Sequence, residues 1–280
     1  MKTMGLRAVS CVVAILAVAG CAATGTSGPR SAVSQDLDRI LAGEQRSAEN
    51  RARDIYRHPK ETLLFFGLRE DTKVVEVWPG GGWYTEIVAP LVSAKGKYYA
   101  ARIQADPQSK YITDGLKNYE AKLQTRPDLY GKVQLTELGP SGGEIAPPNS
   151  VDLVLTFRNM HNWMGRDYAP QAFAAMYRAL KPGGVLGVVE HRGNPAVQQD
   201  LQAKSGYVNE DYAIKLIEGA GFKLVSKSEI NANPKDTKDY EGGVWTLPPT
   251  YRMGDKDREK YAAIGESDRL TLKFVKPKKK

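Results

Sequence analysis

Cysteine is nearly absent from this chain of 280 residues, and both examples, Cys11 and Cys21, lie close to its beginning. Beyond Cys21 no pair of cysteines remains, which excludes a disulfide framework and a cysteine-rich metal site in the rest of the chain. Histidine is almost as rare, since only three are present. Chemistry that needs several thiol or imidazole ligands therefore has few residues available.

A long apolar run is also lacking. The run from Ala8 to Ala19 is too short and too weakly flanked for a comfortable membrane span. It follows two basic residues and ends in Val18-Ala19-Gly20-Cys21, which resembles the lipobox of bacterial lipoproteins. The resemblance implies a signal peptide over residues 1–20 and a lipid on Cys21, which would anchor the chain to a membrane without spanning it. An ordinary secretory signal with an incidental cysteine is the alternative.

The residues after this cysteine bear on location and domain organisation. Ala22, in place of an aspartate, resembles the outer-membrane sorting pattern of two-membrane bacteria, so we expect a lipid-anchored protein of the cell envelope that faces the periplasm. Residues 21–34 are mostly small and polar and predict a flexible tether. Residues 35–280 have the composition of one globular domain, because the chain is 41% hydrophobic and 26% charged.

Charge of one sign is not strongly in excess, with a formal net charge of +8. Aromatic and basic residues are not interleaved as nucleic-acid-binding surfaces require, so we predict no nucleic-acid partner. Four lysines stand among the last five residues, Lys276 and Lys278–Lys280. We interpret them as a solvated tail, with contact to anionic lipid as the alternative. The sequence indicates no oligomeric state.

The domain alternates between strand and helix patterns. Weak apolar stripes predict a helical cap over residues 35–70. The later pattern predicts strands at residues 73–78, 97–103, 132–138, 151–157, 185–190, 222–230 and 269–275, with helices at 84–92, 109–123, 169–180 and 209–220. Strands separated by such helices form a parallel sheet covered on both faces, and ligands bind at the carboxyl ends of its strands.

One stretch has the residue order of a ligand-binding turn. Val74-Val75-Glu76-Val77 is typical of a buried strand, Trp78-Pro79-Gly80-Gly81-Gly82 of a tight turn, and the run from Tyr84 of a helix. Glycine lets the backbone approach a ligand, and a helix N-terminus offers free N–H groups. A turn that merely connects a strand to a helix would show the same order.

Three segments together resemble class I S-adenosylmethionine-dependent methyltransferases, and among them the bacterial "predicted methyltransferase" family whose first motif reads EVWPGGGWYTE. They are Glu76–Glu86, Leu155–His161 and Tyr177–Leu186, and the resemblance extends over roughly residues 58–277. It implies an α/β, Rossmann-like, doubly wound sheet of seven strands, of which the last is antiparallel. It also implies S-adenosylmethionine as the cofactor, bound by Glu76, Trp78, Gly80, Gly81, Gly82, Arg102, Arg158 and Asn159.

Two positions depart from the superfamily pattern. Trp78 stands where the first glycine belongs, and its ring could cover the ligand or face the core. Arg102 stands where an acid grips the ribose hydroxyls; a guanidinium can donate to these oxygens but cannot accept from them. Either the cofactor is held differently, or the site prefers an anionic nucleotide, or Arg102 forms a surface ion pair. Asp106 is close enough in sequence to replace the missing acid.

Polar residues with catalytic potential follow the fourth predicted strand. A neutral histidine can remove a proton from an acceptor hydroxyl, so we hypothesise that His161 is the catalytic base. A histidine that only hydrogen-bonds the loop backbone is the alternative. Asn162 and Trp163, which follow it, are predicted to contact the substrate.

A second polar group follows the fifth predicted strand. Glu190 and His191 could position an acceptor, and Arg192 suits an anionic substrate group, although a structural ion pair would also account for it. Because no third ligand stands at a suitable spacing, we predict no metal site. Residues 231–267 form a long connection that we interpret as a substrate-covering flap, with a surface excursion as the alternative.

The sequence signals conflict over function. The motifs predict methyl transfer to a small or lipid-linked acceptor, whereas the lipobox places the domain where S-adenosylmethionine is not expected. The alternative is a non-catalytic ligand-binding lipoprotein that reuses the fold. A nicotinamide-dependent oxidoreductase is disfavoured, because Thr85 stands where the dinucleotide fingerprint has its last glycine.

Overall fold

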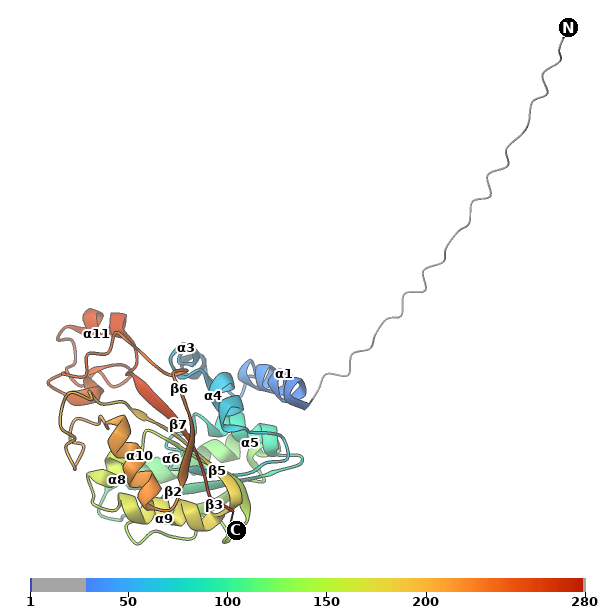
Figure 1. The fold of residues 1–280 in the computed structure, drawn as a ribbon, viewed down its shortest axis with the longest axis horizontal. Helices are drawn as coiled ribbons and strands as arrows, with labels where there is room; N and C mark the ends of the chain where they lie inside the picture. The colour runs from blue at the N-terminus through green and yellow to red at the C-terminus, as the bar shows by residue number, and fades with distance from the viewer. Residues whose placement is uncertain (2–28, 279–280) are drawn as a thin grey trace.

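A seven-stranded sheet forms the centre of the protein (Figure 1). The computed structural model describes residue 1 and residues 29–278. The strand order is β3-β2-β1-β4-β5-β7-β6, and β7 runs antiparallel to both of its neighbours. The strands are β1 Lys73–Val77, β2 Lys97–Ile103, β3 Gln134–Leu138, β4 Val151–Phe157, β5 Leu180–His191, β6 Lys223–Ser228 and β7 Arg269–Val275. The predicted fold class is confirmed, including the antiparallel last strand.

Burial separates the central strands from the edge strands. In β1 only Lys73 is exposed, and β4 is buried except for the half-buried Asp152. The edge strand β6 instead alternates between exposed and half-buried residues. A parallel strand covered on both faces is apolar throughout, whereas an edge strand alternates. The order of the strands in the sheet reverses between β1 and β4. The crevice at the carboxyl ends of these two strands is therefore the expected ligand site.

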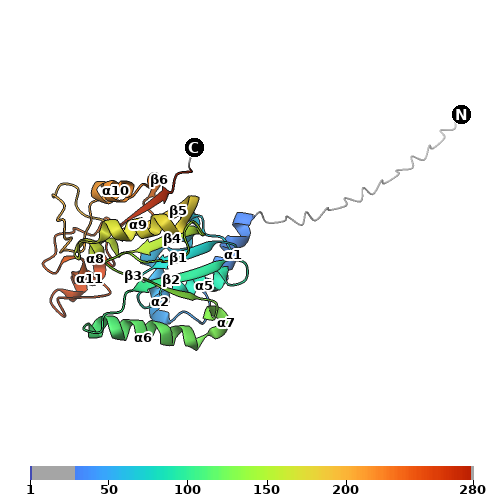
Figure 2. The same ribbon diagram turned by 90° about the horizontal axis from the view of Figure 1, so that it is seen from below.

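Helices cover both faces of the sheet (Figure 2). The helices are α1 Pro29–Leu41, α2 Ala48–Ala52, α3 Asp54–Arg57, α4 Pro59–Phe66, α5 Thr85–Val92, α6 Lys110–Thr125, α7 Pro127–Tyr130, α8 Met160–Met164, α9 Ala169–Ala179, α10 Glu210–Gly219 and α11 Arg258–Ile264, with a 3-10 helix at Gly243–Thr246. One apolar core includes residues of α8, α9 and α10, and a second core on the opposite face includes residues of α1, α4, α5, α6 and α7.

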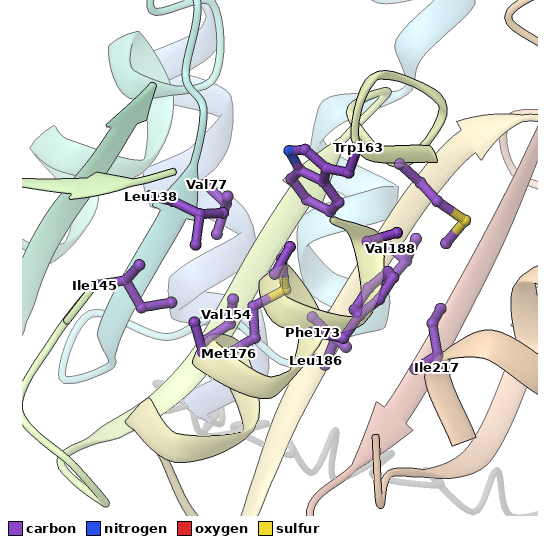
Figure 3. Packing of buried hydrophobic residues seen from close by; sticks show 14 of the residues in the cluster. Val77, Leu138, Ile145, Val154, Trp163, Phe173, Met176, Leu186, Val188 and Ile217 are labelled. Atoms are coloured by element: carbon purple, nitrogen blue, oxygen red, sulfur yellow. The ribbon is translucent and has the colours of Figure 1, made fainter. Parts of the chain in front are cut away.

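The first of these cores is shown in Figure 3. Side chains of the sheet meet side chains of α8, α9 and α10, and the labelled residues are Val77, Leu138, Ile145, Val154, Trp163, Phe173, Met176, Leu186, Val188 and Ile217. Full burial of one such side chain stabilises the fold by about 1.5–3 kcal/mol. This packing fixes β1 and β4 beside each other and thereby fixes the crevice at their ends.

Most predicted elements are found at their predicted places. The bounds of β2, β4 and β7 agree with the predicted ranges. The helices α7, α8 and α11 were not predicted, because segments of 4, 5 and 7 residues are too short to show a period. The strand predicted from residue 185 begins at Leu180 instead, since Leu180 already pairs with Val151 of β4.

The N-terminal part of the domain corrects one prediction. Helix α1 begins at Pro29, so residues 29–34 belong to a helix and not to the predicted tether. Val33 and Leu37 explain this helix, because both are buried in the core that α4 and α5 share. Cys21 and the predicted signal peptide lie outside the described residues. In the part of the chain that the structure describes, no helix is long and apolar enough to cross a membrane.

The C-terminal lysines are not all solvated. Lys276 is only 8% exposed. Its Nζ donates to Asn149 Oδ1 at 2.7 Å, to the carbonyl of Tyr177 at 2.7 Å and to the carbonyl of Leu180 at 2.8 Å. The predicted solvated tail is therefore wrong for Lys276, which ties the end of β7 to α9 and β5.

Candidate functional site

A cavity of about 480 Å³ lies at the carboxyl ends of β1, β4 and β5. Its size falls within the range of small-molecule sites, which is about 300–1,000 Å³. Four parts of the chain close it: helices α2 and α3, the turn after β1, the segment after β4, and residues 244–269. The cavity thus occupies the crevice that the strand order predicts.

The glycine turn after β1 forms one wall. Gly80 and Gly81 line the cavity, and a Cβ built on either would meet no atom within 4 Å. Gly80 also has a φ of +57°, which favours glycine. Gly82 faces elsewhere, because a Cβ there would lie 3.1 Å from side-chain atoms of Tyr119 and of Lys122. Two of the three predicted glycines therefore border the cavity, and the third permits close packing on α6.

Glu76 is buried beneath this turn. Its carboxylate accepts hydrogen bonds from the hydroxyls of Tyr98 and Thr85, the latter at 3.2 Å. Burial raises the pKa of Glu76 to about 7, although both hydroxyls oppose this shift. A buried carboxyl that borders a cavity and titrates near neutral pH would be stabilised in its charged form by a cationic ligand group.

Trp78 separates the cavity from a second one. Its Nε1 donates to the carbonyl of Leu138 at 3.2 Å, and its ring lies edge-on to Trp163 with centroids 5.8 Å apart. The second cavity, of about 220 Å³, is lined by Asp106 and Leu138, and Trp78 is the lining residue that the two cavities share. Trp78 has a φ of +50°, which costs a non-glycine residue about 1–2 kcal/mol.

Arg102 does not reach the cavity. Its guanidinium pairs with Glu120 and, at 3.2 Å, with Glu137. Arg102 and Glu137 are direct partners across β2 and β3, which explains the pairing. The prediction that Arg102 contacts the cofactor is therefore wrong in this arrangement. The nearby acid, Asp106, lines only the second cavity.

Some residues of the segment after β4 line the cavity, and others are buried in the core. Arg158, Asn159 and Asn162 line the cavity. Asn159 donates from Nδ2 to the carbonyl of Val77 at 2.8 Å, which joins the exits of β1 and β4. Trp163 is fully buried in the apolar core (Figure 3), so its predicted contact with a substrate is wrong.

His161 and Glu190 form a buried hydrogen-bonded pair. His161 Nδ1 lies 3.0 Å from Glu190 Oε1, and the backbone N–H of His161 donates to Oε2 at 3.3 Å. Donation from Nδ1–H to the carboxylate leaves Nε2 of His161 as an acceptor. Nδ2 of Asn162 lies 3.1 Å from this Nε2, and His161 lines the cavity. This is the geometry of a general base whose ring is oriented by a carboxylate.

His191 completes a group of three ligand-type side chains. Suitable atoms of His161, Glu190 and His191 all lie within 4.8 Å of one another. The sequence did not indicate this group, because His161 and Glu190 stand far apart in the chain. Burial and then the charges of His161 and Arg269 hold the pKa of His191 well below its usual range. His191 Nδ1 lies 2.6 Å from Ser267 Oγ, so the group is largely satisfied by hydrogen bonds, and its cationic surroundings disfavour a metal ion.

Arginines form a further part of the cavity wall. Glu266 accepts from Arg53 Nε at 2.5 Å, from Arg57 Nε at 3.2 Å and from Arg269. Burial alone would raise the pKa of Glu266, but the charges of Arg269, Arg57 and Arg53 hold it well below its usual range. Arg158 lines the same cavity, and burial, followed by the charge of Arg158, holds the pKa of Arg57 well below its usual range. Sequence reasoning missed this wall because α2 and α3 are about 210 residues away from Glu266.

Residues 231–267 provide part of the cavity wall. Val244, Trp245, Pro248 and Glu266 line it, and the Trp245 ring lies edge-on to His161 at a centroid distance of 5.9 Å. The contact agrees with the interpretation of this segment as a covering flap. Arg192, by contrast, is turned away and pairs with other acidic residues, namely Glu210, Glu229 and Asp268. Its predicted contact with a substrate is wrong.

Comparison with known proteins agrees with this fold. Residues 79–188 match a family model described as a methyltransferase domain. No curated protein matches the chain. Among solved structures, an S-adenosylmethionine-dependent methyltransferase from Aquifex aeolicus is similar, with 16% identity, a TM-score of 0.55, and coverage of 88% of this chain and 98% of that one. The [4+2]-cyclase SpnF is 17% identical, with a TM-score of 0.56 and coverage of 88% and 93%.

A third similar structure contains S-adenosylhomocysteine, the product that S-adenosylmethionine leaves after methyl transfer. It is an N-methyltransferase from Haemonchus contortus in complex with S-adenosylhomocysteine, with 16% identity, a TM-score of 0.55, and coverage of 88% of this chain and 61% of that one. At such identities the likeness shows the fold. The chain therefore has the class I methyltransferase fold.

Proposed function

We propose that this protein transfers a methyl group from S-adenosylmethionine to an acceptor bound in the main cavity. One observation carries the proposal: the glycine turn after β1 opens, at Gly80 and Gly81, onto a cavity at the switch point of a class I methyltransferase fold. Gly80 and Gly81 leave room for the backbone to approach the methionine part of the cofactor. Glu76 offers a carboxylate to its ammonium group. When bound, the cofactor supplies an electrophilic methyl group on a sulfonium.

The acceptor is activated by His161. Nε2 of His161, which the Asn162 amide occupies in the structure, exchanges this partner for the acceptor and takes the proton that an acceptor hydroxyl or amine loses as its new bond to the methyl carbon forms. Glu190 holds the ring and stabilises the imidazolium that results. Trp245 and the neighbouring part of residues 231–267 limit the access of water. Positioning of the two reactants supplies the remaining acceleration.

Replacing Gly81 with valine tests cofactor binding at the turn. The new side chain would enter open space without backbone strain, so the fold should persist while the cavity loses volume. We expect the affinity for S-adenosylhomocysteine, measured by calorimetric titration of the full chain in detergent, to fall at least about tenfold. The control is Gly115→Val, which also has open space around it but lies on α6 outside the cavity. Equal affinities of both variants would contradict the proposal.

A second candidate function rests on Trp78. The indole stands between the two cavities, and Arg102 does not supply a ribose contact. A non-catalytic binding protein that uses only the main cavity would have this arrangement. The cyclase among the similar structures illustrates that the fold is not restricted to one chemistry.

Replacing Trp78 with glycine separates the two candidates. The change removes the strained φ and joins the two cavities, and it restores the superfamily pattern. For a methyltransferase in which the indole must move aside for the cofactor, we expect the affinity for S-adenosylhomocysteine to rise about tenfold, because the variant no longer has to displace the indole on binding. Absence of binding to both the wild-type and the Trp78→Gly protein would favour the binding-protein candidate.

We further propose that the protein is held in the cell envelope by a lipid on Cys21, facing the periplasm, and that its acceptor is a small or lipid-linked molecule there. The lipobox-like segment ending at Cys21 supports this location. Metabolic labelling with a fatty-acid probe should mark the wild-type chain and not a Cys21→Ala variant. Equal labelling of both would contradict the anchor.

A further inference from the structure

The arginine wall carries more positive charge than the protein compensates. Arg53, Arg57 and Arg269 share one carboxylate partner, that of Glu266, while Arg158 also acts on the carboxyl of Glu76, whose pKa is about 7. Arg57 is 4% exposed, Arg269 is 2% exposed and Glu266 is 2% exposed. At least about two of these positive charges are thus left uncompensated beside one cavity, in surroundings where charge interactions are poorly screened.

Several donors of this wall have no acceptor. The Arg158 side chain makes no hydrogen bond or ion pair with any residue that the structure describes, although Arg158 lines the cavity. The buried Nε of Arg269 also lacks a partner within the described ranges. Arg57 uses only Nε toward Glu266 and lies over the Trp83 ring, 4.6 Å from its centroid. A buried cation without a partner is costly, so a wall of this kind fits a missing anion.

The cofactor itself does not supply the missing charge. S-adenosylmethionine carries a sulfonium, an ammonium and one carboxylate, which together make it a net cation. One arginine near Trp83 suffices for that carboxylate. Binding of the cofactor therefore leaves the excess at Arg158 and Arg269 unchanged or greater.

Arg158 and Arg269 adjoin the proposed base. Ser267, between Glu266 and Arg269 in sequence, bonds His191, whose backbone N–H donates to Glu190 Oε1 at 2.7 Å. Arg158 follows β4 directly, three residues before His161, and its N–H donates to the carbonyl of Val189 at 2.7 Å. The Arg158 guanidinium and the free Nε of Arg269, whose Nη atoms bond Glu266 and the Tyr56 carbonyl, thus belong to segments next to His161, where an acceptor must sit.

We propose that Arg158, with Arg57 and Arg269, binds an oxyanion of the methyl acceptor, so that the acceptor is a molecule bearing a phosphate or a carboxylate. Guanidinium groups bind both oxyanions through paired, charge-assisted N–H donors. The hydroxyl or amine that is methylated then lies toward His161, on the same molecule. The assignment of the anion to the acceptor rests on the proposed methyl transfer, whereas the anion site itself does not.

Thermal unfolding of the full chain in detergent tests the anion site. Inorganic phosphate and acetate are compared with sodium chloride at equal ionic strength, for the wild type, Arg158→Met and a control, Arg39→Met, which removes an exposed charge on α1. We expect one of the two oxyanions to raise the Tm of the wild type and of the control, and the response identifies which. Arg158→Met should start at a Tm no lower than that of the wild type, because an unpaired, half-buried charge is gone, and should bind the oxyanion at least about tenfold more weakly.

Two results would overturn the site, a third would reassign it to the cofactor, and a fourth would separate it from methyl transfer. No response of the wild type to either oxyanion, or an Arg158→Met protein with a lower starting Tm and an undiminished response, contradicts the anion site. A response that saturating S-adenosylhomocysteine abolishes would mean that the arginines hold the cofactor's carboxylate, which contradicts the acceptor assignment. If S-adenosylhomocysteine does not bind while the Arg158-dependent response remains, the result contradicts the proposed methyl transfer and supports the anion site.

Discussion

His161→Gln is expected to lower the kcat of methyl transfer by about 10²- to 10⁴-fold, the usual contribution of a general base. Glutamine retains a polar side chain of similar reach but cannot take up a proton. Because the ring of His161 is held by Glu190 and not by the glycine turn, the affinity for S-adenosylhomocysteine should stay within about twofold. Turnover with an acceptor, together with calorimetric titration of the cofactor product, would measure both quantities.

Two further variants make this result interpretable. Glu190→Gln should also lower kcat, because the amide no longer fixes the tautomer and orientation of the imidazole. His58→Asn serves as the matched control, since His58 lies outside the cavity lining and asparagine tolerates its left-handed backbone, with a φ of +38°. Full turnover by His161→Gln, with the same pH dependence as the wild type, would exclude the role of base.

Glu266→Gln is expected to destabilise the protein by about 3–5 kcal/mol, which is typical when one partner of a buried ion pair is removed. The carboxylate is the shared partner of Arg53, Arg57 and Arg269, and the amide would leave their charges unpaired. For a domain of this size the Tm should fall by roughly 10 °C. The exposed Glu241, whose only ion pair among the described residues is with Lys256, provides the control Glu241→Gln. Similar melting temperatures of the two variants would contradict this account.

The pH dependence of stability should separate Glu266 from other acids. Its pKa is held well below the usual range in the folded protein, mainly by Arg269 and Arg57 acting against burial. The stabilisation by Glu266 is therefore complete above the ordinary pKa of a glutamate and is lost as the pH falls through the lowered value. Denaturant unfolding between pH 6 and the lowest accessible pH, about 3, should show a steeper decline for the wild type than for Glu266→Gln.

The sheet could be predicted from sequence because its signals are local. Each buried strand carries its own apolar run, as Val151–Phe157 does, and each long helix carries its own stripe, as Lys110–Thr125 does. The order of the strands had no such local signal. The resemblance implied seven strands with the last one antiparallel, and the order itself was observed only in the structure.

The functional site could be predicted only in part. Gly80, Gly81 and His161 were found because a turn and a strand exit mark them locally. The sequence assigned Arg102 and Trp163 to the site, but residues outside their own segments decide where these side chains lie. Arg102 pairs with Glu137 on the neighbouring strand, and Trp163 packs against Phe173 of α9. The arginine wall and the pairing of His161 with Glu190 also depend on chain folding that no short motif records.

The start of α1 and the mouth of the cavity lie at opposite ends of the sheet, which bears on how the protein would face a membrane. Figure 2 shows α1 at one end and α8 and α11 at the other. Gln45, in the loop that follows α1, donates from Nε2 to the carbonyl of Glu86 on α5. The 13-residue helix α1 extends from this loop toward its own start over about 20 Å. If the start of α1 were held close to a membrane, the cavity would face the aqueous space. A diffusible acceptor would enter directly, whereas a lipid-linked one would have to extend its head group past the whole height of the domain.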